Sequence, residues 1–355
     1  MSTDAAPLGA RILFVKLMAL GDVVLASAAP AALKARDPAC RVTWVCANGL
    51  AELVRLFPGV DEVLPVDAGA LLRGGLGART RAVLAAWRPL AGRRFDDVVI
   101  AHQDARYGVL ALPARGRRRR MRRGTTARPL PVAGRWFADE YVRLALGYPD
   151  EGPVTRTWEL ADLRGRLPEG RALVPEADGR AIAVLVPGGA RNALRDTPQR
   201  RWPVERYVEL ARRLHARGHA VVLVGDAADR EVLPAFADVP VIDRLGRLRI
   251  VESTAVLEVA DVVVSHDTGP MHLARLVRAP LVALFGPTSP HDFAPEDART
   301  TVLWGGAALA CRPCYDGREV APCRDNRCMQ DLGVARVEEA ALAMAQSASP
   351  AEVRA

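Results

Sequence analysis

The segment SHDTGPMHLA, residues 265–274, sets an acid, a hydroxyl, a glycine and a proline between an apolar run and an amphipathic helical pattern. Asp267 or Thr268 can cap the helix, and Pro270 suits its first turn because proline has no N–H to leave unpaired. Gly269 lets a ligand approach the backbone, where free N–H groups and the helix dipole favour a phosphate. The segment therefore predicts either a well-capped helix or the seat of an anionic ligand.

Two further segments place charged or small residues directly after an apolar run. In the first, Gly21 and Asp22 follow ILFVKLMAL, and Asp22 could either take a proton from a substrate hydroxyl or cap the next helix. The second segment spans residues 186–207 and contains Arg200 and Arg201. These arginines could clamp phosphate oxygens, or they could form a solvated basic turn.

Four of the six cysteines form the pattern C-x2-C-x8-C-x4-C, at Cys311, Cys314, Cys323 and Cys328. Four thiolates at such spacing are typical of a structural zinc or a single iron. Free thiols packed in a loop, or reversible disulfides, are the alternatives. A metal held by four protein ligands has no open coordination position, so it would hold the loop and take no part in catalysis.

The formal net charge of +8 depends on one run, RGRRRRMRR at residues 115–123, which contains seven arginines. We expect a basic loop that could bind nucleic acid, anionic lipid head groups or an anionic acceptor, or that could simply be solvated. Aromatic residues make up only 5% of the chain and do not interleave with the arginines. This argues against a stacking platform for single-stranded nucleic acid.

The elements that position these segments repeat one pattern in two halves. Strand patterns lie at residues 11–17, 40–47, 95–102, 181–188, 219–226, 241–245, 260–266 and 279–286. Helical patterns lie at residues 23–36, 51–57, 204–218 and 270–278. Apolar strands that alternate with amphipathic helices indicate parallel sheets covered on both faces. We therefore predict an α/β protein with two Rossmann-like domains, residues 1–170 and 171–355, facing a central cleft, with residues 164–180 as linker.

No apolar run approaches the roughly 20 residues that a membrane helix needs. Lys16 interrupts ILFVKLMAL, which makes a poor signal peptide and a good first strand. We expect a cytoplasmic protein that could rest on the inner face of the inner membrane, and this compartment disfavours disulfides.

Taken in order, the GD of the first loop, PGGA…RRWPVERY and DTGPMHLA…PLVALFGPTSP resemble glycosyltransferase family 9, the heptosyltransferases of lipopolysaccharide assembly. The resemblance spans most of the chain. It implies a GT-B architecture in which the C-terminal domain holds the nucleotide sugar, the N-terminal domain holds the acceptor, and a last helix at residues 334–348 packs back on the first domain. The implied reaction is an inverting transfer of heptose from ADP-heptose to an anionic lipid-linked saccharide.

The resemblance also implies roles for individual residues. Asp22 matches the family's catalytic aspartate, and Arg200 lies where the family commonly has a basic residue for the diphosphate. The other members of the implied substrate-binding set are Gly21, Arg201, Asp229, Asp267, Thr268, Gly269, Pro270, Met271 and His272. Asp229 would hold the ribose hydroxyls, and His272 is interpreted as a packed histidine. Leu25 stands where one branch of the family has a histidine, which argues against that branch.

No catalytic metal is expected, because the helix N-terminus and the arginines would stabilise the leaving diphosphate. The cysteine cluster is similar to one that holds a metal in some members, so a structural zinc or iron is implied there. Within the same fold, another nucleotide sugar could serve surface polysaccharide synthesis. A Rossmann-type oxidoreductase would need G-x-G-x-x-G, which is missing. A basic nucleic-acid-binding protein lacks a recognition signature, so no nucleic-acid partner is expected.

Overall fold

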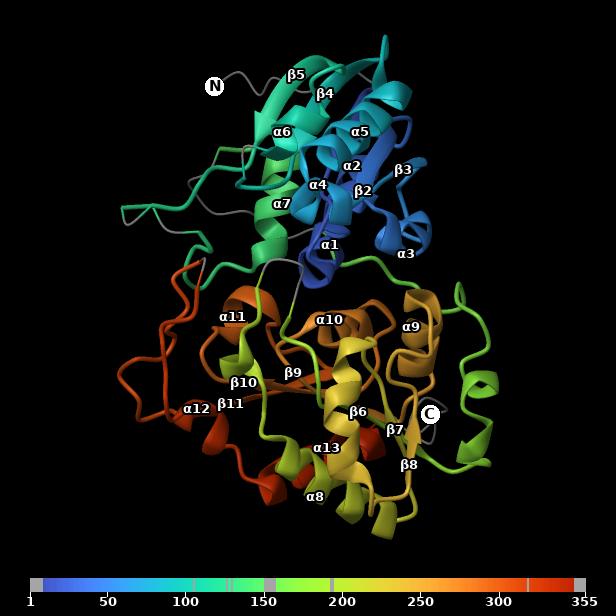
Figure 1. The fold of residues 1–355 in the computed structure, drawn as a ribbon, viewed down its shortest axis with the longest axis vertical. Coiled ribbons are helices and arrows are strands. Elements are labelled where there is room, and N and C mark those ends of the chain that lie inside the picture. The colour runs from blue at the N-terminus through green and yellow to red at the C-terminus, as the bar shows by residue number, and fades with distance from the viewer. Residues whose placement is uncertain are drawn as a thin grey trace. The chain divides into compact units, whose positions relative to one another are not determined.

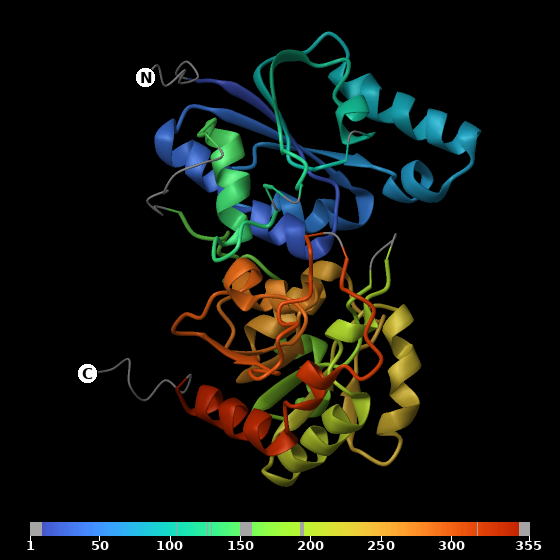
Figure 2. The same ribbon diagram turned by 90° about the vertical axis from the view of Figure 1, so that its left-hand side faces the viewer.

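The computed structural model describes residues 9–104, 106–125, 127–128, 130–149, 158–191, 195–317 and 319–347. The chain forms two compact units, Met1–Asp162 and Leu163–Ala355. Each unit contains one parallel β-sheet with helices packed on it (Figures 1 and 2). The predicted α/β fold with two Rossmann-like units is therefore confirmed.

The N-terminal unit contains a five-stranded sheet of order β3-β2-β1-β4-β5. Its strands are β1 (Arg11–Val15), β2 (Arg41–Ala47), β3 (Glu62–Val66), β4 (Arg94–Ile100) and β5 (Arg115–Arg120). Its helices are α1 (Leu20–Ala26), α2 (Ala28–Arg36), α3 (Ala51–Arg55), α4 (Ala68–Arg73), α5 (Leu76–Trp87), α6 (Arg106–Leu110) and α7 (Phe137–Leu146), with short 3-10 turns at Asn48–Leu50 and Arg88–Leu90. Leu13 and Val15 of β1 pack with residues of α5 and α6 on one face of the sheet.

The C-terminal unit contains a six-stranded sheet of order β11-β10-β9-β6-β7-β8. Its strands are β6 (Ile182–Val186), β7 (Ala220–Leu223), β8 (Val241–Asp243), β9 (Val262–His266), β10 (Leu281–Phe285) and β11 (Thr300–Trp304). Its α-helices are α8 (Val204–Ala216), α9 (Ile250–Glu258), α10 (Gly269–Leu276), α11 (Pro290–Phe293), α12 (Arg327–Gln330) and α13 (Val334–Ser347). Its 3-10 helices are Arg171–Leu173, Pro175–Ala177, Pro198–Arg200 and Ala228–Phe236.

The last helix, α13, is part of the C-terminal core. Val337, Ala341 and Met344 are buried in one cluster with residues of α8 and of the central strands. That α13 also contacts the first domain stays a prediction. Its apolar face is already covered within its own unit.

The arginine run is mostly a strand, so the predicted loop is wrong. Residues 115–120 form β5, the edge strand paired with β4. Alternate residues of a strand share a face, and Arg117 and Arg119 both reach the fully buried Asp97 of β4, at 2.8 Å and 3.1 Å. Arg118 donates to the carbonyl oxygen of Ala114 at 3.1 Å. Several arginines of the run therefore stabilise the edge strand β5, through ion pairs with β4 and a hydrogen bond to the backbone.

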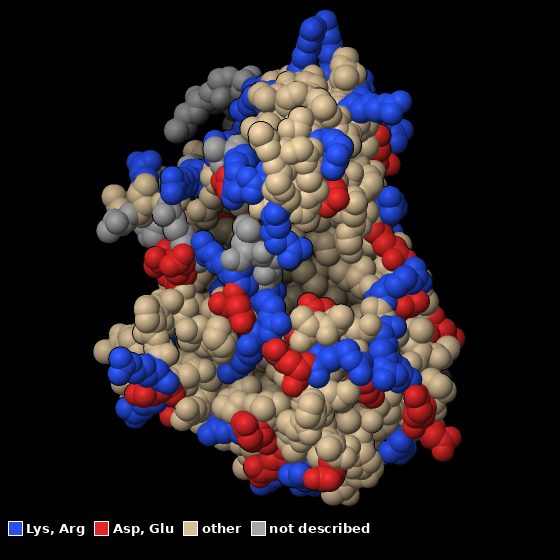
Figure 3. All heavy atoms as spheres, in the orientation of Figure 1, with Lys and Arg blue, Asp and Glu red and all other residues tan. Residues whose placement is uncertain are grey.

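Basic side chains elsewhere are mixed with acidic ones. On the face drawn in Figure 3, arginine side chains are interspersed with aspartate and glutamate over the C-terminal unit. Among the described residues, no helix combines the length and the apolar character needed to cross a bilayer.

We expect Asp97→Ala to lower the free energy of unfolding by about 3–5 kcal/mol, because it removes the buried carboxylate that two arginines contact. Urea denaturation of the full chain measures this loss. The control is Asp96→Ala on the same strand, which removes an exposed carboxylate that accepts one hydrogen bond from the backbone N–H of Arg11 and should cost about 1 kcal/mol. Equal losses would show that Asp97 does not clamp β5.

Candidate functional site

The strand order of the C-terminal sheet reverses between β6 and β9. In doubly wound sheets, the loops after the strands at such a point diverge and leave room for a ligand. The loop after β6 carries Gly188 and Gly189, and the loop after β9 carries Asp267 and Thr268. These two loops contact each other directly, so they form one site.

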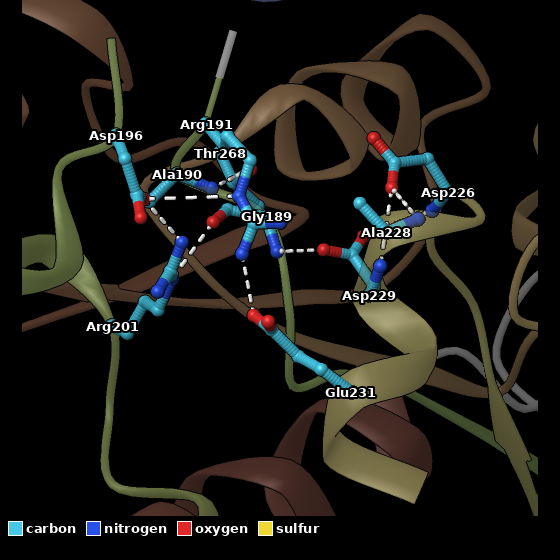
Figure 4. Close-up of polar contacts among 10 residues, drawn as sticks. All are labelled: Gly189, Ala190, Arg191, Asp196, Arg201, Asp226, Ala228, Asp229, Glu231 and Thr268. Carbon is cyan, nitrogen blue, oxygen red and sulfur yellow. Dashed lines mark hydrogen bonds and ion pairs between the residues drawn. The ribbon is translucent and has the colours of Figure 1, made fainter.

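Two glycines, Gly188 and Gly189, permit this close approach, and Figure 4 shows Gly189 beside Thr268 and Asp229. A Cβ atom on Gly189 would lie 2.3 Å from Thr268 Oγ1, and one on Gly188 would lie 2.4 Å from Asp229 Cγ. In their place, the Gly189 N–H donates to Asp229 Oδ1 at 2.6 Å, and the Ala190 N–H donates to Thr268 Oγ1 at 2.9 Å. The loop after β6 is thus fixed by two side chains from other loops.

Both carboxylate oxygens of Asp229 accept backbone hydrogen bonds, one from the loop after β6 and one from the loop after β7. Besides the bond from Gly189, its Oδ2 accepts the N–H of Asp226 at 2.8 Å. Burial raises the pKa of Asp229. The residue expected to hold ribose hydroxyls is therefore already engaged by the backbone, whereas the neighbouring Asp226 is exposed.

Neither Asp267 nor Thr268 caps α10. Thr268 is the N-cap residue by backbone position, but its side chain makes no capping hydrogen bond. Asp267 Oδ2 accepts the Thr288 hydroxyl at 2.6 Å and lies 3.4 Å from Nη1 of Arg200. The predicted capping by the side chain of Thr268 is thus wrong, and the N-cap residue leaves the N–H groups in the first turn of α10 uncapped.

Arg200 and Arg201 have different surroundings. Arg201 is committed to the site itself, because its Nε donates to the carbonyl oxygen of Gly189 at 2.9 Å and its guanidinium pairs with Asp196 (Figure 4). Arg200 pairs with Asp267, and its guanidinium lies 5.2 Å from the ring centroid of Tyr315. Arg200 is therefore the cation of this pair that lies beside the N-terminus of α10.

The side chains of the other predicted residues of α10 are part of the helix and its packing. Pro270 occupies the first turn, and Met271 and His272 are buried. His272 Nε2 lies 3.9 Å from Asp267 Oδ1. His266, at the end of β9, was not predicted; its Nδ1 is 3.0 Å from the Tyr207 hydroxyl, and burial lowers its pKa to about 3.

In the N-terminal unit, Gly21 and Asp22 lie in the first turn of α1, next to the reversal of strand order between β1 and β4. Asp22 forms a 2.9 Å ion pair with the buried Lys16, which follows β1. After β4, His102 stacks on Tyr107 with ring centroids 3.8 Å apart. Burial and the nearby Lys16 charge lower the pKa of His102 to about 4. The sequence analysis did not predict that Lys16 and His102 lie beside Asp22. A lysine at the end of an apolar strand could have indicated Lys16.

The cysteine loop contacts the site through the backbone. The N–H groups of Cys314 and Tyr315 donate to the carbonyl oxygen of Pro287, at 3.0 Å and 3.2 Å. Cys311 and Cys323 are exposed, and burial raises the pKa of the Cys314 and Cys328 thiols. Among the described residues, no three His, Cys, Asp or Glu side chains are placed to hold a metal ion.

The chain resembles known proteins of one class. The family model described as glycosyltransferase family 9 (heptosyltransferase) matches residues 146–323. Lipopolysaccharide heptosyltransferase 1 of Pseudomonas aeruginosa is 30% identical over 325 residues, which cover 86% of this chain and 86% of that protein. Lipooligosaccharide heptosyltransferase 2 of Haemophilus influenzae is 34% identical over 113 residues, a match that spans 30% of this chain and only 33% of that relative.

A solved structure shares the fold along nearly the whole chain. It is described as E. coli ADP-heptose lps heptosyltransferase II, and its TM-score is 0.72 at 20% sequence identity. The likeness covers 95% of this chain and 98% of that chain.

We expect Gly189→Ala to destabilise the protein more than Gly218→Ala. Both glycines have a positive φ, +89° and +90°, so both alanines carry a similar backbone penalty. Only the Cβ at position 189 meets a neighbour, Thr268, and the forced shift should cost about 1–3 kcal/mol more. Chemical denaturation measures both variants. Equal losses would mean that the contact between the two loops is not tight.

Proposed function

The chain belongs to glycosyltransferase family 9, and from this premise we propose that it transfers heptose from ADP-heptose to an anionic saccharide of the lipopolysaccharide core. The named relatives are heptosyltransferases of lipopolysaccharide or lipooligosaccharide. The observation that carries the proposal is the N-terminus of α10, whose N-cap side chain makes no capping hydrogen bond and beside which Arg200 lies.

The C-terminal unit is proposed to hold the donor. Backbone N–H groups in the first turn of α10 and the guanidinium of Arg200 would bind the diphosphate, as helix N-termini and arginines do in other phosphate sites. As the bond to the anomeric carbon breaks, negative charge develops on the diphosphate oxygen. The same N–H groups and Arg200 stabilise that charge. Asp267 and Thr288 fix the position of Arg200.

The N-terminal unit is proposed to hold the acceptor and the base. The acceptor hydroxyl oxygen bonds to the anomeric carbon, ADP leaves from the opposite side, and the hydroxyl proton passes to the carboxylate of Asp22. This single displacement inverts the configuration at the anomeric carbon. Support for the role comes from the position of Asp22 after β1, one-third exposed and beside a lysine.

The cysteine cluster is assigned no step in the reaction. Four thiolates around a zinc or an iron would leave no open coordination position, so such a metal could only stabilise the loop. The described residues do not form a group that fits a metal as they stand. The backbone bonds from Cys314 and Tyr315 to Pro287 already hold the loop near Thr288.

We also propose that the exposed ends of the arginine run contact the anionic inner face of the inner membrane, where a lipid-linked acceptor lies. Arg115 and Arg123 are exposed. Each basic residue near an anionic surface contributes about 1 kcal/mol, so Arg115→Ser/Arg123→Ser should weaken binding to vesicles containing anionic lipid by about tenfold or more. Co-sedimentation measures it. Arg212→Ser/Arg336→Ser removes the same charge from exposed positions of the C-terminal unit and should change little; equal effects would contradict a role for the run.

Calorimetric titration without added metal should show that the protein binds ADP in preference to UDP, GDP and NAD. Arg200→Gln should weaken ADP binding by about tenfold or more, because a charge-assisted hydrogen bond is lost. The matched control is Arg212→Gln on the exposed side of α8, which should leave the affinity unchanged. A preference for UDP or GDP would replace the proposed donor. A preference for NAD, or no nucleotide binding, would overturn the proposed activity.

A further inference from the structure

Lysine is almost missing from this basic chain. Of the 49 Lys and Arg residues, only Lys16 and Lys34 are lysines. Both form 2.9 Å ion pairs with an aspartate, but their burial differs: the side chain of Lys16 is 2% exposed and that of Lys34 is 25% exposed. The one fully buried lysine is thus the residue that contacts the proposed base.

The position of Lys16 is fixed by its backbone as well as by its side chain. Its N–H donates to the carbonyl oxygen of Val45 at 3.1 Å, and its carbonyl oxygen accepts the Trp44 indole N–H at 3.0 Å. The ammonium nitrogen lies 5.1 Å from the ring centroid of Tyr141 and 2.9 Å from Asp22 Oδ2. A buried ammonium is costly unless it is paired, so the Asp22 carboxylate and the Tyr141 ring offset its desolvation.

We propose that Lys16 is a positioning residue that holds the Asp22 carboxylate in place and in its ionised form, ready to accept the proton of the acceptor hydroxyl. The inference rests on the proposed function of Asp22 as base. An ammonium is a compact point charge on a flexible stem, whereas a guanidinium is a broad planar fork. The Asp22 carboxylate and the Tyr141 ring face thus meet a compact ammonium at this place in an arginine-rich chain.

The other groups around this pair do not change charge near neutral pH. Burial lowers the pKa of His102 to about 4, so its ring is neutral above that pH. Burial raises the pKa of Tyr107, which keeps its hydroxyl protonated. The hydrogen bonds from Arg106 lower the pKa of Asp104, which stays ionised. Tyr141, from α7, contributes only its ring face to the ammonium. The acid limb of the activity profile is thus assigned to the Asp22 carboxyl, which the Lys16 ammonium contacts.

The test compares pH profiles of kcat/KM for the wild type, Lys16→Met and Lys34→Met. The base works when deprotonated, and an opposite charge within about 4–6 Å lowers a carboxyl pKa by about 1–3 units. Loss of the ammonium should therefore move the acid limb of the Lys16→Met profile upward by about 1–3 pH units. The variant should lose at least about tenfold in rate below that limb and recover at high pH. Lys34→Met, which removes the pair with Asp61, should leave the profile unchanged.

A loss of activity at all pH values with an unmoved acid limb would show a merely structural role and overturn the proposal, as would an unchanged profile. A second readout needs no transferase activity: the titration of the Asp22 carboxyl carbon by NMR in selectively labelled protein, assigned with Asp22→Asn. Its pKa should rise in Lys16→Met, or in Lys16→Gln if the methionine variant does not fold. If the wild type transfers no heptose yet this pKa rises, the proposed function fails while the pairing stands; an unmoved pKa overturns the pairing.

Discussion

The approach of the Gly189 backbone to the Thr268 hydroxyl is the constraint on which the C-terminal site depends. No side chain fits between the two loops, because a Cβ at residue 189 would lie 2.3 Å from Thr268 Oγ1. The threonine hydroxyl is used to accept a hydrogen bond from Ala190. It therefore does not cap α10, and the helix keeps its N-terminal N–H groups available for a ligand. Close packing of one loop thus prepares a binding site on the next.

Aspartates organise several cations of this arginine-rich chain. Asp97 holds two arginines of β5, Asp267 holds Arg200 beside α10, and Asp22 pairs with Lys16 after β1. The first arrangement stabilises an edge strand and leaves nothing for a small ligand. The other two lie at the reversal points of the two sheets, where parallel folds bind ligands. The position of each pair in its sheet, and not the charge alone, separates the structural cations from those that we propose to be functional.

The central strands and the main helices of both units could be predicted because buried parallel strands are continuous apolar runs. The edge strand β8 was predicted at residues 241–245, whereas the edge strands β3, β5 and β11 were not. β3 is short and contains Pro65, which a strand pattern disfavours, and β5 has no apolar residue. The predicted helix over residues 23–36 is two helices, α1 and α2, with Ser27 between them, because the Ser27 hydroxyl accepts the distant Ala161 N–H. Such a contact across 134 residues has no local signal.

The loops that form the candidate site could be predicted, but the partners of its individual side chains could not. The sequence pattern identified the loops after β6 and β9, since glycines and a proline at strand ends have a local meaning. It could not show that Asp229 accepts a hydrogen bond from the Gly189 N–H or that Arg201 donates one to the Gly189 carbonyl oxygen. These partners are far apart in the chain. Lys16 was interpreted as an interruption of an apolar strand, and only the fold places it against Asp22.

The most direct measurement is a crystal structure of the protein with bound ADP. The account predicts diphosphate density at the first turn of α10, within hydrogen-bonding distance of its backbone N–H groups and of the Arg200 guanidinium. It also predicts that the loop after β6 keeps its bonds to Asp229 and Thr268. A diphosphate bound in the N-terminal unit beside Asp22, or away from α10, would contradict the assignment of donor and base to separate units.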